Sequence, residues 1–190
     1  MNAAANSHST QVNSQKISFQ PGSSTNLQLD PLGLAPIPED SRQRFLRFRL
    51  SGEDVTLLPL TEIAEVLQLT TAEILPIPDV PPWLLGVCNW RGEMLWLVDA
   101  SRLVGGVPLW HQVPTLEHPM VIVVRSSERT VGLLVEQVDD VDLIAPETIV
   151  HLQNIDSPIL APLIAGHLPD HQGIILDAAL LIEHSFRTLS

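Results

Sequence analysis

The sequence predicts an all-β fold, either a small barrel or a pair of barrels, and two observations support this expectation. About ten short apolar segments that suit strands occur along the chain, with frequent Pro and Gly between them. No long helical pattern alternates with them, and only Leu180–Phe186 reads as a helix, at the C-terminus. Frequent short strands with this punctuation are typical of barrels rather than of helical or α/β folds.

The composition predicts one globular domain preceded by a tail. The chain has 190 residues, of which 45% are hydrophobic, and a formal net charge of -12. Residues 1–41 are dominated by Asn, Ser, Gln, Thr, Ala and Pro, so we expect a flexible tail, then a domain over 42–185 and a C-terminal end over 186–190. A second possibility for the tail is a short motif that folds onto a partner or the body, formed by Leu27, Leu29, Leu32, Leu34 and Ile37.

The first part of the domain predicts a hairpin. Apolar and charged residues alternate over 46–50, the period of a strand with one buried face, and a second strand is expected over 55–60. The turn residues at 51–54 join them. A single helical turn capped by Thr61 is expected over 61–67, and 74–77 returns to an extended form.

The segment over 76–99 combines a proline run with a second hairpin. Its prolines fix φ and remove backbone donors, so 76–82 is an extended rim and not a central strand. A short helical turn is expected over 82–85. Strands over 87–90 and 94–98 then flank a tight connection at 91–93, whose glycine can supply a positive φ.

Arg91 is the strongest candidate contact at the tip of this hairpin. Trp90 and Trp96 flank the turn, and the guanidinium has five donors with little prospect of full burial. An arginine in this position indicates a partner contact. The alternative is a structural arginine that hydrogen-bonds to carbonyls of the turn.

The second part of the domain repeats the same pattern. A short helix or turn ended by glycine is expected over 101–106, and strands over 120–124 and 131–135 flank a polar turn at 125–129. Val138 and 141–144 are expected to continue this ribbon beyond an irregularity at Asp139 and Asp140. Two last strands are expected over 163–168 and 174–176, joined by the turn at 169–173.

Composition also excludes several functions. Lysine and arginine total 10 against 22 acidic residues, and Lys16 is the one lysine, so nucleic acid and anionic membranes are not expected partners. The single cysteine, Cys88, excludes an internal disulfide and reads as a small core residue in a reducing compartment. The first residues lack the features of a secretory signal, and no apolar run is long enough to cross a bilayer, so a soluble cytoplasmic protein is expected.

The sequence offers no convincing catalytic, cofactor or metal site. His167 and His171 are four residues apart, but Pro169 between them disfavours the helix that would bring both onto one face. Asp99 lies in a segment similar to the aspartic protease loop, although Ala100 displaces the hydroxyl residue. A small Asp-based hydrolase or a ligand-binding β-barrel that uses Asp99 is therefore the alternative to a non-enzymatic protein.

Several short motifs together resemble the signature of CheW-like domains, the adaptors of bacterial chemotaxis arrays. They are Pro76-Ile77-Pro78, Pro82, Gly86-Val87, Asn89, Arg91-Gly92 and Val98-Asp99. The segments 131–138 and 173–177 are similar to later elements of the same family. The chain departs from the pattern where Trp90 replaces a usual leucine, Trp96 a common proline, and Ala100 a leucine, and in the segment 166–171.

The resemblance implies two intertwined five-stranded SH3-like barrels that share a core, with a short C-terminal helix and no catalysis. It implies an adaptor between the regulatory domain of a CheA-type histidine kinase, bound at barrel edges, and the cytoplasmic tip of a methyl-accepting receptor, bound in a groove between the barrels. The expected contacts are Arg91, Asn89 and Gly92, with a groove of Val66, Leu67, Ile77 and Val80. Those four are equally compatible with ordinary core, and Asn89 and Asp99 with stabilising a turn and a strand end.

The Trp-bearing form of the motif resembles the branch of the family associated with type IV pili and phototaxis in cyanobacteria. The expected location is the cytoplasm, at membrane receptor arrays. A remaining alternative is a competitor that occupies the kinase surface without binding receptors.

Overall fold

The structure is a computed structural model, and it describes residues 40–52, 54–109, 119–126, 129–151, 157–169 and 173–187. Of the tail predicted over 1–41, only Asp40 and Ser41 fall within these ranges, so the tail and its apolar motif lie outside the described residues. The same holds for most of the predicted turn at 169–173.

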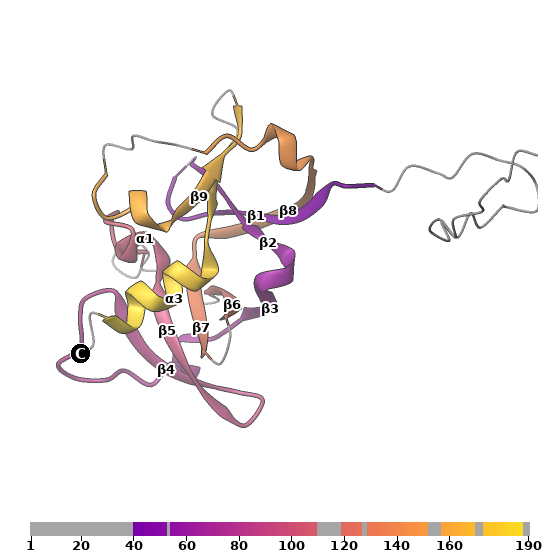
Figure 1. The fold of residues 1–190 in the computed structure, drawn as a ribbon. Coiled ribbons are helices and arrows are strands. Elements are labelled where there is room, and N and C mark those ends of the chain that lie inside the picture. The colour runs from indigo at the N-terminus through magenta and orange to yellow at the C-terminus, as the bar shows by residue number, and fades with distance from the viewer. Residues whose placement is uncertain are drawn as a thin grey trace, which may run out of the picture. The chain divides into compact units, whose positions relative to one another are not determined.

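Two five-stranded sheets form the domain (Figure 1). The first sheet has the order β8-β1-β2-β10-β9 and the second has the order β3-β6-β7-β5-β4. The strands are β1 (Gln43–Arg49), β2 (Val55–Pro59), β3 (Ile63–Gln68), β4 (Leu84–Trp90), β5 (Glu93–Asp99), β6 (Met120–Ser126), β7 (Arg129–Val135), β8 (Gln137–Ile144), β9 (Ile164–His167) and β10 (Ile174–Leu176). Short helices connect them: η1 (Leu60–Glu62), η2 (Thr71–Glu73), α1 (Ala100–Leu103), η3 (Pro146–Thr148), η4 (Ala161–Leu163) and α3 (Ala178–Arg187).

The chain passes between the sheets twice, so the two units are intertwined. It builds β1 and β2 in the first sheet, crosses through η1 to make β3 to β7 in the second, and returns with β8. Late strands insert beside early ones, which produces the parallel pairs β2 with β10 and β5 with β7. The predicted all-β class, with two five-stranded units and a short C-terminal helix, is confirmed.

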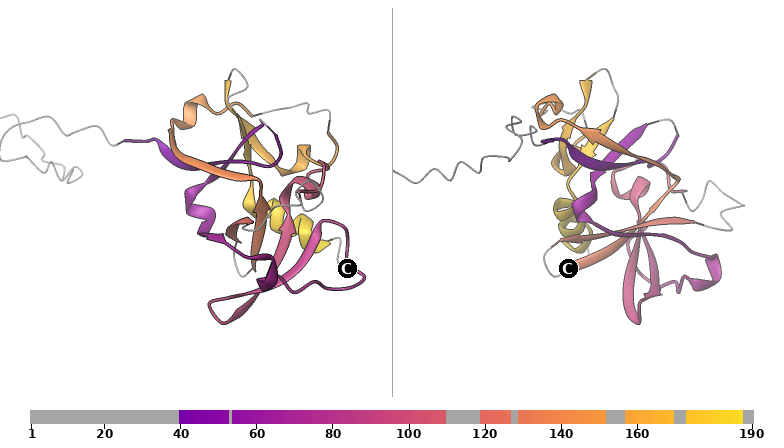
Figure 2. Two further views of the ribbon diagram at one scale, coloured as in Figure 1. Left: turned by 180° about the vertical axis from the view of Figure 1, so that it is seen from behind. Right: turned by 90° about the vertical axis from the view of Figure 1, so that its right-hand side faces the viewer.

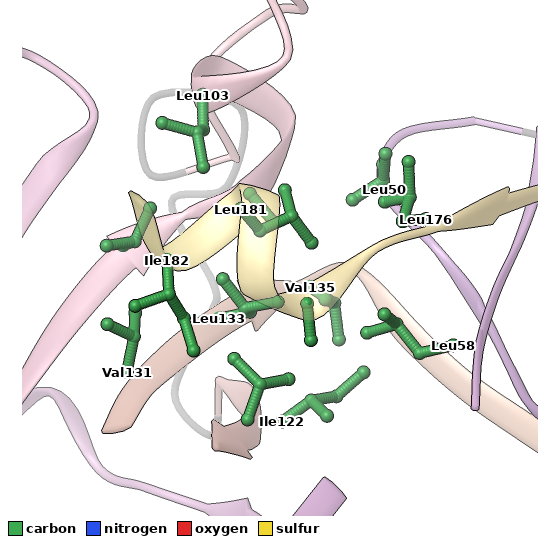
Figure 3. Close-up of a cluster of buried hydrophobic side chains, with 14 of the residues drawn as sticks. Leu50, Leu58, Leu103, Ile122, Val131, Leu133, Val135, Leu176, Leu181 and Ile182 are labelled. Atoms are coloured by element: carbon green, nitrogen blue, oxygen red, sulfur yellow. The ribbon is translucent and has the colours of Figure 1, made fainter. Parts of the chain in front are cut away.

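Helix α3 packs against the core that the sheets share (Figure 3). Leu181 and Ile182 of the helix are 1% and 2% exposed, and they lie over Val131 and Leu133 of β7. The same cluster contains buried side chains of both sheets, such as Leu58 of β2. Burial of this apolar surface from two sheets and a helix is the main stabilising contribution to the domain.

The prediction of a helical turn over 61–67 is wrong. The helical turn is η1, which ends at Glu62, and the residues after it form strand β3, which pairs with β6. Along β3 the half-buried residues alternate with exposed ones, because one face packs on the core while the other meets solvent. The predicted cap is also absent, since the residue before η1 is Pro59 and no side chain caps it.

Two other boundaries differ from expectation. The helical turn predicted over 82–85 is limited to Pro82 and Trp83, because the amide of Leu84 bonds to the carbonyl of Pro81 and β4 begins there. The polar turn predicted over 125–129 is shorter, since β6 continues to Ser126 and β7 begins at Arg129.

The predicted irregularity at Asp139 and Asp140 is confirmed as a bulge. The register between β1 and β8 shifts between Leu46 and Phe48, opposite these two residues. Strand β8 does not extend the β6–β7 ribbon, however, because it pairs with β1 in the other sheet.

Glu62 links the crossover between the sheets to helix α3. Its Oε2 accepts a hydrogen bond of 3.1 Å from the backbone N–H of Ala178, in the first turn of the helix. Burial raises the pKa of the Glu62 carboxyl, the Ala178 hydrogen bond opposes this, and the charge of Asp177 adds to the rise. The folded protein therefore holds this carboxylate at a desolvation cost.

We expect the Glu62→Gln variant to change how stability depends on pH. Because the folded pKa lies above the ordinary value of 4.5, the free energy of unfolding of the wild type falls as pH rises from that value through the folded pKa. The variant lacks this titrating group. Urea denaturation from about pH 4 to about pH 7 should show the wild type losing stability relative to the variant. A constant difference across this range would contradict the prediction.

Candidate functional site

The β4–β5 hairpin projects from one end of the second sheet (Figure 2) and ends in a two-residue turn. Arg91 and Gly92 occupy the turn with φ of 53° and 86°, the positive values of a type I′ turn. Asn89 Oδ1 accepts a hydrogen bond of 3.0 Å from the Gly92 N–H. The predicted hairpin is present, but Glu93 pairs with Trp90 and so belongs to the strand rather than the turn.

Asn89 and Gly92 therefore have evident structural roles at the tip. An ideal Cβ at Gly92 would meet nothing within 4 Å, so glycine is required there by the positive φ and not by crowding. The Asn89 side chain accepts the hydrogen bond of the Gly92 amide in the turn. This contact agrees with the alternative role of Asn89, in which it stabilises the turn.

Four side chains meet at this end of the second sheet, and we refer to Glu65, Trp90, Arg91 and Arg125 as the tip cluster. Glu65 Oε2 accepts hydrogen bonds from Trp90 Nε1 at 2.8 Å and from Arg91 Nε at 3.1 Å, and Arg91 Nη2 lies 2.9 Å from the same oxygen. The Arg91 side chain nevertheless remains 66% exposed. Its hydrogen bonds thus run to a carboxylate on another strand, and not to turn carbonyls among the described residues.

The Trp90–Glu65 hydrogen bond also explains how the second sheet closes. Glu65 belongs to β3 and Trp90 to β4, the two opposite ends of the sheet order. A direct bond between the end strands requires the sheet to curl into a barrel. Leu67, Cys88 and Trp90 pack in the cluster on its inner side, so Cys88 is the buried core residue that the sequence predicts.

The electrostatics of the cluster favour an ionised Glu65 between cations. The Trp90 hydrogen bond, followed by the charge and hydrogen bond of Arg91, lowers the pKa of the Glu65 carboxyl. The guanidinium carbons of Arg91 and Arg125 lie 5.1 and 5.9 Å from the centroid of a Trp90 ring. Both distances are within the range of cation–π attraction.

The proline rim is attached to the hairpin through Leu75. The backbones of Leu75 and Val87 exchange two hydrogen bonds of 2.8 and 2.9 Å, which fixes the segment before the prolines against β4. Gly86 allows this approach, because a Cβ there would lie 2.2 Å from the Leu75 carbonyl oxygen. Leu75 is 63% exposed. Pro76, Pro78 and Pro82, which follow it, are exposed as well.

The four residues predicted to line one groove occupy different surroundings. Leu67 packs against the cluster inside the second barrel, whereas Val80 packs against the core shared by both sheets. Val66 is 37% exposed and points to the opposite face of β3 from Leu67. Ile77 is half-buried in the proline rim. Of the four, Leu67 fits the core alternative best, and Val66 is the most accessible.

Asp99 has the geometry of a strand-end stabiliser. Its side chain is fully buried, and its two oxygens accept hydrogen bonds from the backbone N–H groups of Arg102 at 3.1 Å and Leu109 at 2.8 Å. The carboxylate thereby begins helix α1 and holds the loop after it. This arrangement disfavours the alternative in which Asp99 acts on a substrate.

The sequence reasoning missed two members of the tip cluster. The sequence pattern predicts Glu65 in a helical turn and Arg125 in a polar turn, and it brings neither residue near Arg91. The available signal for Glu65 was its position between Ile63 and Leu67, where alternation predicts the same face of a strand.

The described residues contain no group of three or more His, Cys, Asp or Glu arranged to hold a metal ion. The pair His167 and His171 is not tested by this observation, because His171 lies outside the described residues. None of the helices in the described parts of the chain has the length and apolar character needed to cross a bilayer.

The family model "CheW-like domain" matches residues 44–186. The chain is 33% identical over 99 residues to "Chemotaxis protein CheW" of Rhizobium meliloti (strain 1021), which covers 52% of this chain and 59% of that protein. It is 29% identical over 117 residues to "Probable chemotaxis protein CheW" of Rhizobium etli, which covers 62% of this chain and 71% of that protein.

The fold is similar to a solved structure. The crystal structure of scaffolding protein TtCheW from Thermoanaerobacter tengcongensis superimposes with a TM-score of 0.64 at 22% sequence identity, covering 75% of this chain and 93% of that chain. This likeness concerns the fold, and it agrees with the two intertwined barrels described above.

Proposed function

The chain belongs to the family of CheW-like domains, and on this premise we propose that it is a non-catalytic adaptor in a chemotaxis-type signalling system. It holds the regulatory domain of a CheA-type histidine kinase and the cytoplasmic tip of a methyl-accepting receptor in a fixed geometry. The adaptor function resides in residues 42–185, preceded by the tail over 1–41. A scaffold needs a rigid surface and no reactive group. The ordered β4–β5 hairpin supports the first requirement, and the buried, hydrogen-bonded Asp99 supports the second.

The observation that carries this proposal is the ordered but exposed Arg91. Two contacts to Glu65 and the ring of Trp90 fix the position of its side chain, while two thirds of its surface remain accessible. A guanidinium that is already ordered loses less conformational entropy when a partner binds. Arginine is also among the residues that contribute most to protein interfaces.

Other surfaces of the domain suit the remaining contacts. Strand β3 ends the second sheet and is an edge strand, the kind of element to which a related barrel adds, whereas the Leu75 bridge occupies part of the outer side of β4. The accessible Val66 on β3 and the half-buried Ile77 and Val80 are the apolar contacts we propose for a receptor helix. Leu67 supports this surface from the core side.

We expect the Arg91→Ala variant to bind its cognate partner about tenfold more weakly, because the variant loses the guanidinium at the hairpin tip. Calorimetric titration of the purified adaptor with the kinase regulatory domain, and separately with the receptor tip, measures the change. Arg44→Ala is the matched control, since Arg44 is an exposed arginine on β1 of the other sheet. Unchanged affinity of the Arg91→Ala variant for both partners would remove Arg91 from the interface.

The same titration separates the adaptor from a competitor. An adaptor binds the receptor tip without kinase, whereas a protein that only occupies the kinase surface does not. We place the protein in the cytoplasm at receptor arrays, in chemotaxis, phototaxis or type IV pilus motility. The genes adjacent to its own, encoding a receptor, a kinase or pilus proteins, would distinguish these systems.

A further inference from the structure

Arg125 is a second cation at the hairpin tip whose role the adaptor proposal does not use. It is exposed, and it lies on β6 two residues after Val123, whose side chain packs inside the second barrel. Alternation along the strand places Arg125 on that same side, one step beyond the core, at the rim beside Trp90. The strand pairing therefore brings this arginine to the ring that Arg91 also contacts.

The two arginines differ in their ionic partners. Arg91 pairs with Glu65, whereas none of the four ion pairs among the described residues includes Arg125. The tip cluster holds two cations against the one carboxylate of Glu65, so it carries one net positive charge on a chain whose formal net charge is -12. Such a site attracts carboxylates most strongly at low salt.

Trp90 gives Glu65 a donor that does not depend on Arg91. The indole Nε1 lies 2.8 Å from Glu65 Oε2, the oxygen that Arg91 also contacts. When Arg91 turns to another carboxylate, Glu65 keeps the indole hydrogen bond and is not left without a partner on the protein. Because a half-buried carboxylate without a partner is costly, the indole reduces the free energy needed to release Arg91.

We propose that Arg91 and Arg125, both held against Trp90, form a two-cation site for an acidic segment of a partner protein, with Glu65 retained by the indole when Arg91 changes partner. This inference rests on the proposed adaptor function for the identity of the partner, but the site itself can be tested without one. The ligand chemistry is a polypeptide that presents two carboxylates within reach of both guanidinium groups.

A hexaglutamate peptide titrated into the full chain at low salt tests the site, with the indole N–H resonance of Trp90 followed by NMR. We expect saturable shifts of this resonance, assigned by its absence in the Trp90→Phe variant. Arg125→Gln should weaken binding about fivefold, the size of one exposed charge pair. Arg44→Gln changes the net charge equally on the other sheet and should leave the affinity unchanged.

The role of the indole has its own readout. In the Trp90→Phe variant, followed by the backbone amide of Gly92, binding of hexaglutamate should also weaken, because Glu65 then depends on Arg91. Absence of binding by the wild type, or equal affinities in Arg125→Gln and wild type, would overturn the inference. So would an equal loss in Arg44→Gln, since that result would indicate general charge attraction only.

Cognate partners separate this inference from the proposed function. If the wild type binds the kinase domain or receptor tip and Arg125→Gln binds both equally well, the two-cation site is wrong for the partner and the adaptor function stands. If the peptide binds through both arginines but neither cognate domain binds, the site stands and the adaptor function fails.

Discussion

The Gly86→Ala variant should be destabilised by about 3 kcal/mol or more, with a thermal midpoint lowered by about 10 °C. A Cβ at this position would lie 2.2 Å from the carbonyl oxygen of Leu75 and 2.9 Å from its carbonyl carbon. These are backbone atoms, so no rotamer change can relieve the overlap. The φ of 141° adds strain for any residue with a side chain. Thermal and urea denaturation measure the effect.

Gly52 provides the matched control. Its φ of 70° is also positive, but a Cβ there would meet nothing within 4 Å. Gly52→Ala should therefore cost only the backbone strain, about 1 kcal/mol. Equal losses in the two variants would show that the close approach at Leu75 contributes nothing.

Hydrogen exchange locates the consequence of the Gly86 change. The amides of Leu75 and Val87 each bond to the other residue's carbonyl, at 2.8 and 2.9 Å. If the added methyl group pushes the two segments apart, both amides should lose protection in the variant before the other amides of β4 do. The proline rim would then be attached to the hairpin less firmly, which links a glycine of the family motif to the proposed partner surface.

The hairpin was predictable because its determinants are local. The glycine at 92 supplies the positive φ, the asparagine at 89 bonds to the turn amide, and apolar residues flank both. Neighbouring residues along the chain settle this geometry, whatever the rest of the fold does. The bulge at Asp139 and Asp140 was predictable for the same reason, since two adjacent carboxylates interrupt an apolar pattern.

The tip cluster was not predictable from those local patterns, because pairing between distant strands creates it. Glu65 and Trp90 are 25 residues apart, and they meet only because the second sheet closes on itself. Apolar residues lie on both faces of β3, so the alternation typical of a strand is weak there. The sequence pattern therefore predicts a helical turn over 61–67, and it does not predict the contact between Glu65 and Trp90. Predicting Arg91 as an exposed side chain required the turn alone, whereas predicting its ionic partner required the register of the whole sheet.

The parallel pairs were beyond the sequence patterns for a related reason. Strand β10 lies beside β2, and β7 beside β5, although other strands separate each pair along the chain. Hairpin signals describe only antiparallel neighbours joined by a short turn. The division into two five-stranded barrels therefore came from the family resemblance, and the strand count alone supported only a barrel or a pair of barrels.

Helix α3 depends on Leu181 for its attachment to the shared core, so the Leu181→Ala variant should lose about 3 kcal/mol of unfolding free energy. The side chain is 1% exposed and lies among Leu133, Ile182 and other members of the core cluster (Figure 3). Truncation would leave a cavity bounded by strands that cannot move together without breaking their own pairing. Urea denaturation measures the loss.

Leu180 is the control for Leu181, because it is the same residue type in the same helix but is 39% exposed. Leu180→Ala should cost less than about 1 kcal/mol, since alanine favours the helix and little apolar contact is lost. The core cluster contains side chains from both sheets and the helix, so we also expect the two barrels of Leu181→Ala to unfold in one transition. A variant in which α3 detaches while both sheets stay folded would show that the helix covers the core without joining the barrels.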